Sequence, residues 1–271
     1  MADNKGAYSR LAPDPCGSLW FLRFMEGCKR RMSQDSRPNR ALSSDLMREL
    51  LSCVEGKAVN ATTISERHMW VMTGAYFCFS YILSLRGSEG LLTDLEGMEE
   101  HFEGRENYVV VPILGKFKGE HHTKQHLLSS VNSGIQVRLW GTRLLAIHRS
   151  QGRTRGPAFI NSKGMQSSSK EFNQLLIGYL TEIFEDNHLL FAIDIKKAED
   201  VSEKYLISRS FRRGSESRAV AMNVSSSDRY AVNRWRQKEQ AGAGRVNHTI
   251  DQHYTDVVLA PDSFLRYTKA M

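Results

Sequence analysis

Residues 69–85 read "MWVMTGAYFCFSYILSL" and form the longest stretch of the chain without a charged side chain. The run falls just short of the length that a membrane-spanning helix needs, and it contains Gly, Thr, Ser and Tyr. It therefore predicts a helix that is buried in the centre of the fold, against which the neighbouring segments would pack.

The segments on either side of this run predict a helix before it and a hairpin after it. "LSSDLMRELLSCV" (42–54) has apolar residues at helical spacing, and Ser43 or Ser44 is a suitable N-cap. "NYVVVPIL" (107–114) is rich in β-branched residues, and "GKFKG" (115–119) supplies turn residues before a second extended segment, "TKQHLLSSV" (123–131). These features are typical of a β-hairpin.

The remaining patterned segments read as helices, with two further short ones near the C-terminus. The longer ones are "GIQVRLWGTRLLAIHRS" (134–150), "SSKEFNQLLIGYLTEIF" (168–184), "SRSFRRGSESRAVAMN" (208–223) and "SSDRYAVNRWRQKEQ" (226–240). The sequence thus predicts a mainly α protein with a small β-hairpin or sheet, an α+β fold.

A break near residue 38 predicts two parts. "SLWFLRFMEGCKRRM" (18–32) has helical spacing, and "SQDSRPNRA" (33–41) interrupts it. We expect an N-terminal segment over residues 1–38, which could be the end of a separate helical domain, and a main domain over residues 39–271.

Positive charge is concentrated in one stretch. The chain has 37 basic and 30 acidic residues and a pI near 9.3. Residues 204–245 hold ten of the basic residues against three acidic ones, and the rest of the chain is balanced. This stretch therefore carries the whole excess, which favours a polyanionic partner. The four cysteines are widely spaced and lack a CxxC pair, which favours a reducing compartment.

Several polar residues have the types needed to cleave DNA through a phosphotyrosine. That reaction requires a tyrosine nucleophile, two arginines that hold the phosphate, and a proton donor for the leaving 5′ oxygen. Guanidinium groups bind phosphate oxygens as a planar fork and stay protonated at working pH, so the chemistry requires no metal. The candidates are Arg86, Lys116 or Lys118, Arg209, Arg212, Trp235 and Tyr254.

Five motifs occur in the order in which a known family has them. Together they resemble the catalytic domain of tyrosine recombinases, the phage-integrase-like family, in the eukaryotic transposon-borne form related to fungal Crypton-like elements. The resemblance spans roughly residue 40 to the C-terminus. The motifs are "LRGSEGLLTDL" (85–95), "LGKFKGE" (114–120), "SRSFRRG" (208–214), "NRWR" (233–236) and "DQHYTD" (251–256).

The resemblance implies a role for each matching residue and an integrase-like catalytic-domain fold. Glu89 would be the acid that supports the first arginine, and no cofactor and no metal are implied. The implied catalytic set is Arg86, Lys116, Arg212, Trp235 and Tyr254, with Lys118 as the alternative lysine. The implied DNA-binding set is Arg209, Arg213, Lys118 and Arg234.

Two departures from the family pattern leave alternatives open. Arg209 stands where the family usually has His, and a guanidinium can contact phosphate but cannot accept a proton. The separation of Trp235 and Tyr254 is 19 positions, which is longer than usual for the family. Tyr267 is therefore the alternative nucleophile.

The segment "EHHTKQH" (120–126) suggests a metal site only superficially. We expect it to be a strand after a turn, on which His122 and His126 would be too far apart to share an ion.

The function expected from the resemblance is site-specific recombination or transposition of DNA through a covalent 3′-phosphotyrosine. The alternatives are a catalytically inactive DNA-binding remnant and a type IB topoisomerase-like enzyme. The implied partners are double-stranded DNA and further copies of the chain in a homo-tetramer, whose subunits exchange a C-terminal segment, with no membrane. The expected location is the nucleus if the chain is eukaryotic and otherwise the cytoplasm.

Overall fold

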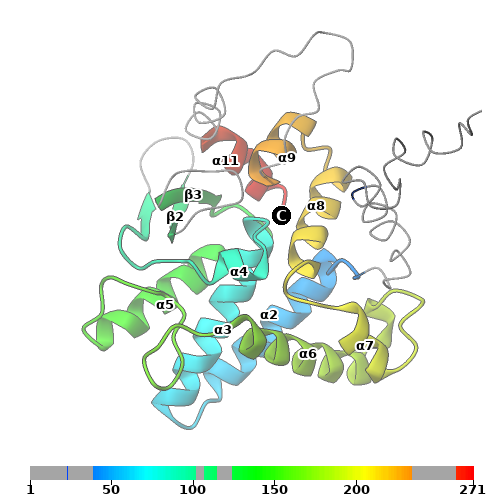
Figure 1. Cartoon of the computed structure of the whole chain (residues 1–271), viewed down its shortest axis with the longest axis horizontal. Coiled ribbons are helices and arrows are strands. Elements are labelled where there is room, and N and C mark those ends of the chain that lie inside the picture. Colours follow the sequence, from blue (N-terminus) through cyan, green and yellow to red (C-terminus); the bar gives the residue numbers. More distant parts are fainter. Residues whose placement is uncertain (1–22, 24–38, 102–106, 115–123, 234–260) are drawn as a thin grey trace, which may run out of the picture. The chain divides into compact units, whose positions relative to one another are not determined.

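The computed structural model describes residues 39–101, 107–114, 124–233 and 261–271, together with Arg23 (Figure 1). The chain divides into two compact units, Met1–Pro38 and Asn39–Met271. The helix predicted over residues 18–32 lies outside the described residues apart from Arg23. The fold below is therefore that of the second unit.

A buried helix, α3 (Ile64–Ile82), forms the centre of this unit, as the uncharged run predicts. Nearly every side chain from Val71 to its end is buried. Thr63 caps its first turn, because the Thr63 hydroxyl accepts a hydrogen bond from the Glu66 backbone and the Glu66 carboxylate accepts one in return. None of the described helices is long and apolar enough to cross a membrane.

Four further helices surround α3. The helices α2, α5 and α8 pack on it, and α6 packs on α2. Ser43 caps α2, as one of the two predicted N-caps, with its Oγ 3.1 Å from the Leu46 nitrogen. Apolar side chains at helical spacing face α3, which buries them and stabilises the unit. The bounds are α2 (Ser44–Val59), α5 (Val137–Ser150), α6 (Ser169–Asp186) and α8 (Ser210–Ala221).

An antiparallel three-stranded sheet has the order β1 (Glu99–His101), β2 (Tyr108–Leu114), β3 (Lys124–Ser130). The prediction of a hairpin over β2 and β3 is confirmed, with Val110 paired to Leu128. The strand β1 was not expected, since it is a short polar segment that forms a strand by pairing with β2, where the rings of His101 and Tyr108 stack.

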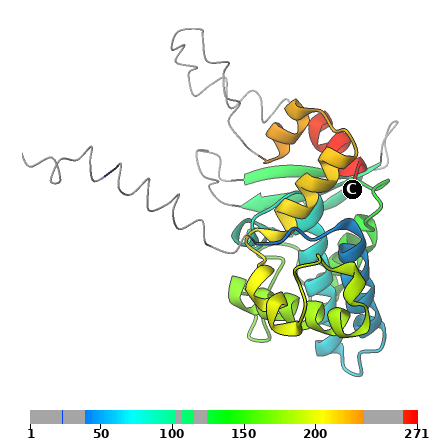
Figure 2. The same ribbon diagram turned by 90° about the vertical axis from the view of Figure 1, so that its right-hand side faces the viewer.

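The remaining elements lie in two separate places. The 3-10 turn η3 (His188–Leu190) and the helix α7 (Ala198–Lys204) pack on α6, whereas α9 (Ser226–Asn233) and α11 (Pro261–Lys269) pack on each other. The short α4 (Gly87–Gly90) follows α3 and packs on it. The helix α11, red in Figure 2, packs on β3 and on α9. The described fold is mainly helical with one small sheet, which confirms the α+β class.

A glycine sets how closely α8 approaches the chain before α2. A Cβ on Gly214 would lie 2.0 Å from the carbonyl oxygen of Leu42, a distance that no side chain tolerates. The Leu42 nitrogen in turn donates to the carbonyl of Ser210. The glycine of "FRRG" is therefore required by backbone contact, and it fixes the position of α8 and of the arginine two residues earlier.

Candidate functional site

Arg86 lies in the turn that follows α3. Ser84 has a left-handed backbone with a φ of 52°, and Arg86 then begins α4 in an extended conformation. The Arg86 nitrogen donates to Glu89 Oε2 at 2.8 Å, and its guanidinium donates to Glu89 Oε1 at 3.2 Å. Both contacts span three residues, so the turn itself sets this pair.

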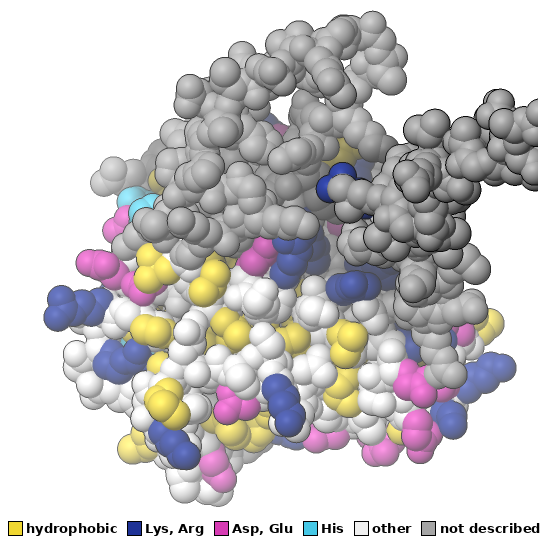
Figure 3. Space-filling model, viewed as in Figure 1, with side chains coloured by type: hydrophobic (Ala, Val, Ile, Leu, Met, Phe, Trp, Pro, Cys, Tyr) yellow, Lys and Arg dark blue, Asp and Glu magenta, His cyan; other side chains and the backbone are white. Residues whose placement is uncertain are grey.

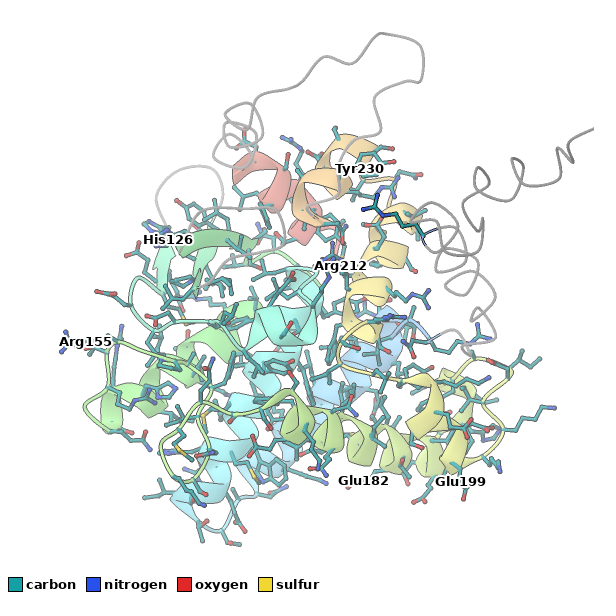
Figure 4. The ribbon with its side chains drawn as sticks, viewed as in Figure 1. His126, Arg155, Glu182, Glu199, Arg212 and Tyr230 are labelled. Atoms are coloured by element: carbon teal, nitrogen blue, oxygen red, sulfur yellow. The ribbon has the colours of Figure 1, made fainter. Side chains whose placement is uncertain are left out.

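Arg212 reaches the same carboxylate from α8. Its Nη1 lies 3.8 Å from Glu89 Oε2, and its Nη2 donates to the backbone carbonyl of Asn233. Figure 4 shows Arg212 between α8 and α4. The two arginines predicted to be catalytic are far apart in the sequence, and the fold brings both to Glu89, the acid predicted to support the first of them.

The cluster has an excess of positive charge and a graded burial. The side chains of Glu89 and Arg212 are 8% and 11% exposed, whereas that of Arg86 is 47% exposed. One carboxylate cannot neutralise two guanidinium groups, so these three residues keep a net charge of about +1 at neutral pH. Through Arg86 the cluster faces solvent, where an anion such as a phosphodiester could bind.

A second layer of polar residues, which the sequence analysis missed, supports Arg212. Asn233 is fully buried, and its amide nitrogen donates to Glu216 Oε2 at 2.7 Å. Its amide oxygen accepts from Ser84 Oγ at 2.6 Å. Arg229 pairs with the other oxygen of Glu216 at 2.5 Å. The sequence gives no signal for this layer, because its members meet only through tertiary structure.

The four arginines of "SRSFRRGSESRA" (208–219) lie in different surroundings. Arg209 is exposed and precedes α8 as its N-cap, while the exposed Arg213 donates to the carbonyl of Asn39. Arg218 donates to the carbonyl of Ala270. Successive helical positions differ by about 100°, so the adjacent Arg212 and Arg213 point in different directions. Of these four arginines, Arg212 is the one that joins Glu89.

Five predicted site residues lie outside the described residues. They are Lys116, Lys118, Arg234, Trp235 and Tyr254. The described chain stops at Leu114 of β2, shortly before the two lysines, and at Asn233 of α9, directly before Arg234 and Trp235. Within the described ranges, no group of three or more His, Cys, Asp or Glu could hold a metal ion.

Tyr267, the alternative nucleophile, has a structural position. It is fully buried, and its hydroxyl lies 2.9 Å from Ser215 Oγ. Burial raises the pKa of Tyr267, which disfavours the phenolate that an attack on phosphorus would use. Phe264 and Met271 are buried beside it, so residues 261–271 pack within their own chain. This arrangement argues against Tyr267 as the nucleophile.

Basic side chains on the described part of one face, dark blue in Figure 3, are scattered among acidic and apolar ones. The described surface in this view therefore offers no broad basic field, and the charge of interest is the small cluster around Glu89.

Comparison with known proteins leaves the family open: no protein-family model matches the chain, and no curated protein sequence matches it either. The resemblance to tyrosine recombinases thus rests on the motifs in this sequence. The convergence of Arg86, Glu89 and Arg212 is a separate observation, because it depends on the fold and not on the motif letters.

Proposed function

We propose that this chain is a DNA strand-exchange enzyme, a site-specific recombinase or transposase of the tyrosine recombinase type. The observation that carries the proposal is that Arg86 and Arg212, from two distant segments, share the buried carboxylate of Glu89. Two guanidinium groups at one site are what the reaction would need to hold a scissile phosphate.

In the proposed reaction, Tyr254 loses its phenolic proton to solvent, its oxygen attacks the phosphorus, and the bond between phosphorus and the 5′ oxygen breaks. Lys116 gives a proton to that leaving oxygen, and the chain becomes joined to the 3′ phosphate. Arg86 and Arg212 neutralise the charge that develops on the non-bridging oxygens. A 5′ hydroxyl from another duplex then attacks the phosphotyrosine, and the tyrosine leaves. The number of phosphoester bonds is conserved, so no nucleotide is consumed.

The two arginines would have different roles in the reaction, because one is buried and the other is half exposed. Arg212 is held by an internal carbonyl and by Glu89, so its guanidinium is positioned before a substrate arrives. Arg86 is half exposed, and its bonds to Glu89 lie within its own turn, which lets it meet an incoming phosphate.

The proposal is tested by trapping a covalent protein–DNA adduct. The substrate is a nicked duplex taken from the DNA flanking the coding sequence, and the product is read on a denaturing gel. The native chain should form an adduct that Tyr254→Phe abolishes and that Arg212→Ala forms about 10²- to 10³-fold more slowly. Tyr267→Phe serves as the matched tyrosine control and should keep the adduct, because Tyr267 is buried.

Other outcomes would favour the other functions. Salt-sensitive binding of the duplex without any adduct would support an inactive DNA-binding remnant, a function that Arg209 in place of the family's His also favours. An adduct accompanied by relaxation of supercoiled DNA, without joining of two duplexes, would support a topoisomerase-like enzyme. An adduct that survives Tyr254→Phe would refute the assignment of the nucleophile.

A further inference from the structure

We propose that Asn233 is a positioning residue that holds the guanidinium of Arg212 in place and joins it to the turn that carries Arg86. Its effect on catalysis rests on the function proposed above. Its effect on Arg212 does not, since that is a property of the folded chain. Asn233 is the first letter of "NRWR", and the resemblance assigns it no role.

The orientation of the Asn233 amide is fixed by its surroundings. The nitrogen faces two groups that only accept, the Glu216 carboxylate at 2.7 Å and the Arg229 carbonyl at 2.9 Å. The oxygen faces the hydroxyl of Ser84, which can donate, at 2.6 Å. A rotated amide would set oxygen against oxygen at Glu216, so only one orientation satisfies all partners.

This arrangement fixes the backbone of Asn233, and the backbone carbonyl is what Arg212 binds. The carbonyl belongs to the last residue of α9 that the structure describes. A side chain that is fully buried and bonded to three partners holds the backbone of the same residue in place. Arg212 therefore donates to an acceptor whose position is set by the side chain of the same residue.

Asn233 also connects the two arginines. Ser84 lies two residues before Arg86 and has the left-handed backbone that turns the chain out of α3. The bond from Ser84 to Asn233 thus ties the Arg86 turn to the end of α9. Displacing Asn233 should move both guanidinium groups relative to Glu89, and loss of such supporting contacts typically lowers activity about 10- to 100-fold.

The charged groups around Asn233 indicate which of two substitutions should disturb Arg212 more. Glu216 and Arg212 face it from α8, and Arg229 faces it from its own helix. Asn233→Ala removes the amide bonds. Asn233→Asp replaces the amide nitrogen by a carboxylate oxygen opposite the Glu216 carboxylate, which adds repulsion between like charges. We expect Asn233→Asp to disturb Arg212 more than Asn233→Ala does.

The first experiment measures Arg212 directly, with no substrate. The Nε–H signals of the arginines are recorded by proton–nitrogen NMR on the full chain, and Arg212→Lys assigns the signal of Arg212. In the native chain this signal should be shifted from the free-arginine position and exchange slowly with water. In Asn233→Ala and Asn233→Asp it should move to the free-arginine position and exchange at least tenfold faster.

The matched control is Asn173→Ala. Asn173 is a partly buried asparagine, whose side chain accepts from the Ile207 nitrogen. Its loss should lower the melting temperature and leave the Arg212 signal unchanged. An Arg212 signal that stays in place in both Asn233 variants, or that moves equally in Asn173→Ala, would overturn the proposal. If the Asn233 variants do not fold, Ser84→Ala removes one bond to the same amide and should give a smaller shift of the same signal.

The second experiment uses the nicked duplex to test whether Asn233 affects the rate of adduct formation or the affinity for DNA. Asn233→Ala should slow adduct formation about 10- to 100-fold while the Kd for the duplex changes less than about twofold. Equal losses of rate and affinity would contradict a positioning role. If the native chain forms no adduct at all, the proposed function fails, and the NMR experiment still decides the role of Asn233.

Discussion

The turn that carries Arg86 and the helix that carries Arg212 hold the same type of side chain against the same carboxylate in different ways. Arg86 is 47% exposed and is set by contacts within three residues. Arg212 is 11% exposed and is set by Glu89 and by the distant Asn233. One arginine depends on local sequence and the other on the folded unit.

This difference implies that loss of either arginine should slow the reaction by a similar factor. Loss of Arg212 should lower the free energy of unfolding more than loss of Arg86 does. A half-exposed ion pair adds little to the free energy of unfolding because water competes for both charges. Arg212 is itself buried, so its removal takes away a packed side chain and the donor to the Asn233 carbonyl. Comparing variants at the two positions therefore separates the effect of each arginine on the reaction rate from its effect on stability.

The largest effects are expected at the arginines themselves. Arg86→Ala and Arg212→Ala should each slow adduct formation on the nicked duplex by about 10²- to 10³-fold, because each removes charge that stabilises the transition state. In urea unfolding, Arg212→Ala should cost about 3 kcal/mol and Arg86→Ala less than about 1 kcal/mol.

Arg138→Ala is the matched control for this pair. Arg138 forms an exposed ion pair with Glu100 and belongs to no part of the candidate site, so both its rate and its stability should stay near native values. Equal losses of stability in Arg86→Ala and Arg212→Ala would remove the contrast between the two regions.

Alanine substitutions of the glycines near the two arginines should also differ in their cost in stability, by a somewhat smaller amount. A Cβ on Gly214 would meet the Leu42 carbonyl oxygen at 2.0 Å, whereas one on Gly87 would meet the side chain of Ile207 at 2.9 Å. Backbone cannot move as easily as a side chain, so Gly214→Ala should cost about 3 kcal/mol and Gly87→Ala about 1 kcal/mol. Urea unfolding measures both.

Gly178→Ala provides the control for helix propensity. Gly178 lies in α6, and a Cβ added there would have no neighbouring atom within 4 Å, so the substitution should stabilise the chain by about 0.5–1 kcal/mol. A Gly214→Ala chain that is as stable as Gly178→Ala would show that α8 can retreat from Leu42.

The smallest effect is expected from the acid titration of the α9–α11 contact. Two hydrogen bonds from Arg266, at 2.7 and 3.0 Å, lower the pKa of Asp228 to about 2. Because this folded-state pKa lies below the ordinary value, the contact stabilises the fold fully above about pH 4 and is lost as the pH falls towards 2. Arg266 is largely exposed, so the contribution should be about 1 kcal/mol.

Thermal unfolding of the native chain and of Asp228→Asn between about pH 2 and 5 tests this expectation. The melting temperature of Asp228→Asn should depend less on pH than that of the native chain. Identical pH dependence in the two proteins would mean that other carboxylates dominate, for example Asp194, whose pKa is also lowered to about 2 by hydrogen bonds from Lys204 and Arg40.

Much of the fold could be predicted from the sequence because its signals are local. The uncharged run 69–85 predicts the buried α3, Ser43 predicts the start of α2, and the β-branched residues 109–111 and 113 predict β2. The strand β1 could not be predicted, because three polar residues carry no periodicity and form a strand only by pairing with β2.

What the sequence by itself determined is the local part of the candidate site: an arginine and a glutamate three residues apart in a turn after a buried helix. The arginines of residues 208–219 were not separable by sequence, since their directions depend on where α8 lies. Only the tertiary structure decided that Arg212 meets Glu89 while Arg213 and Arg218 bind carbonyl groups elsewhere. The physical reason is that contacts between distant segments require the backbone approach at Gly214 and the buried amide of Asn233, and neither has a signature in the local pattern of residues.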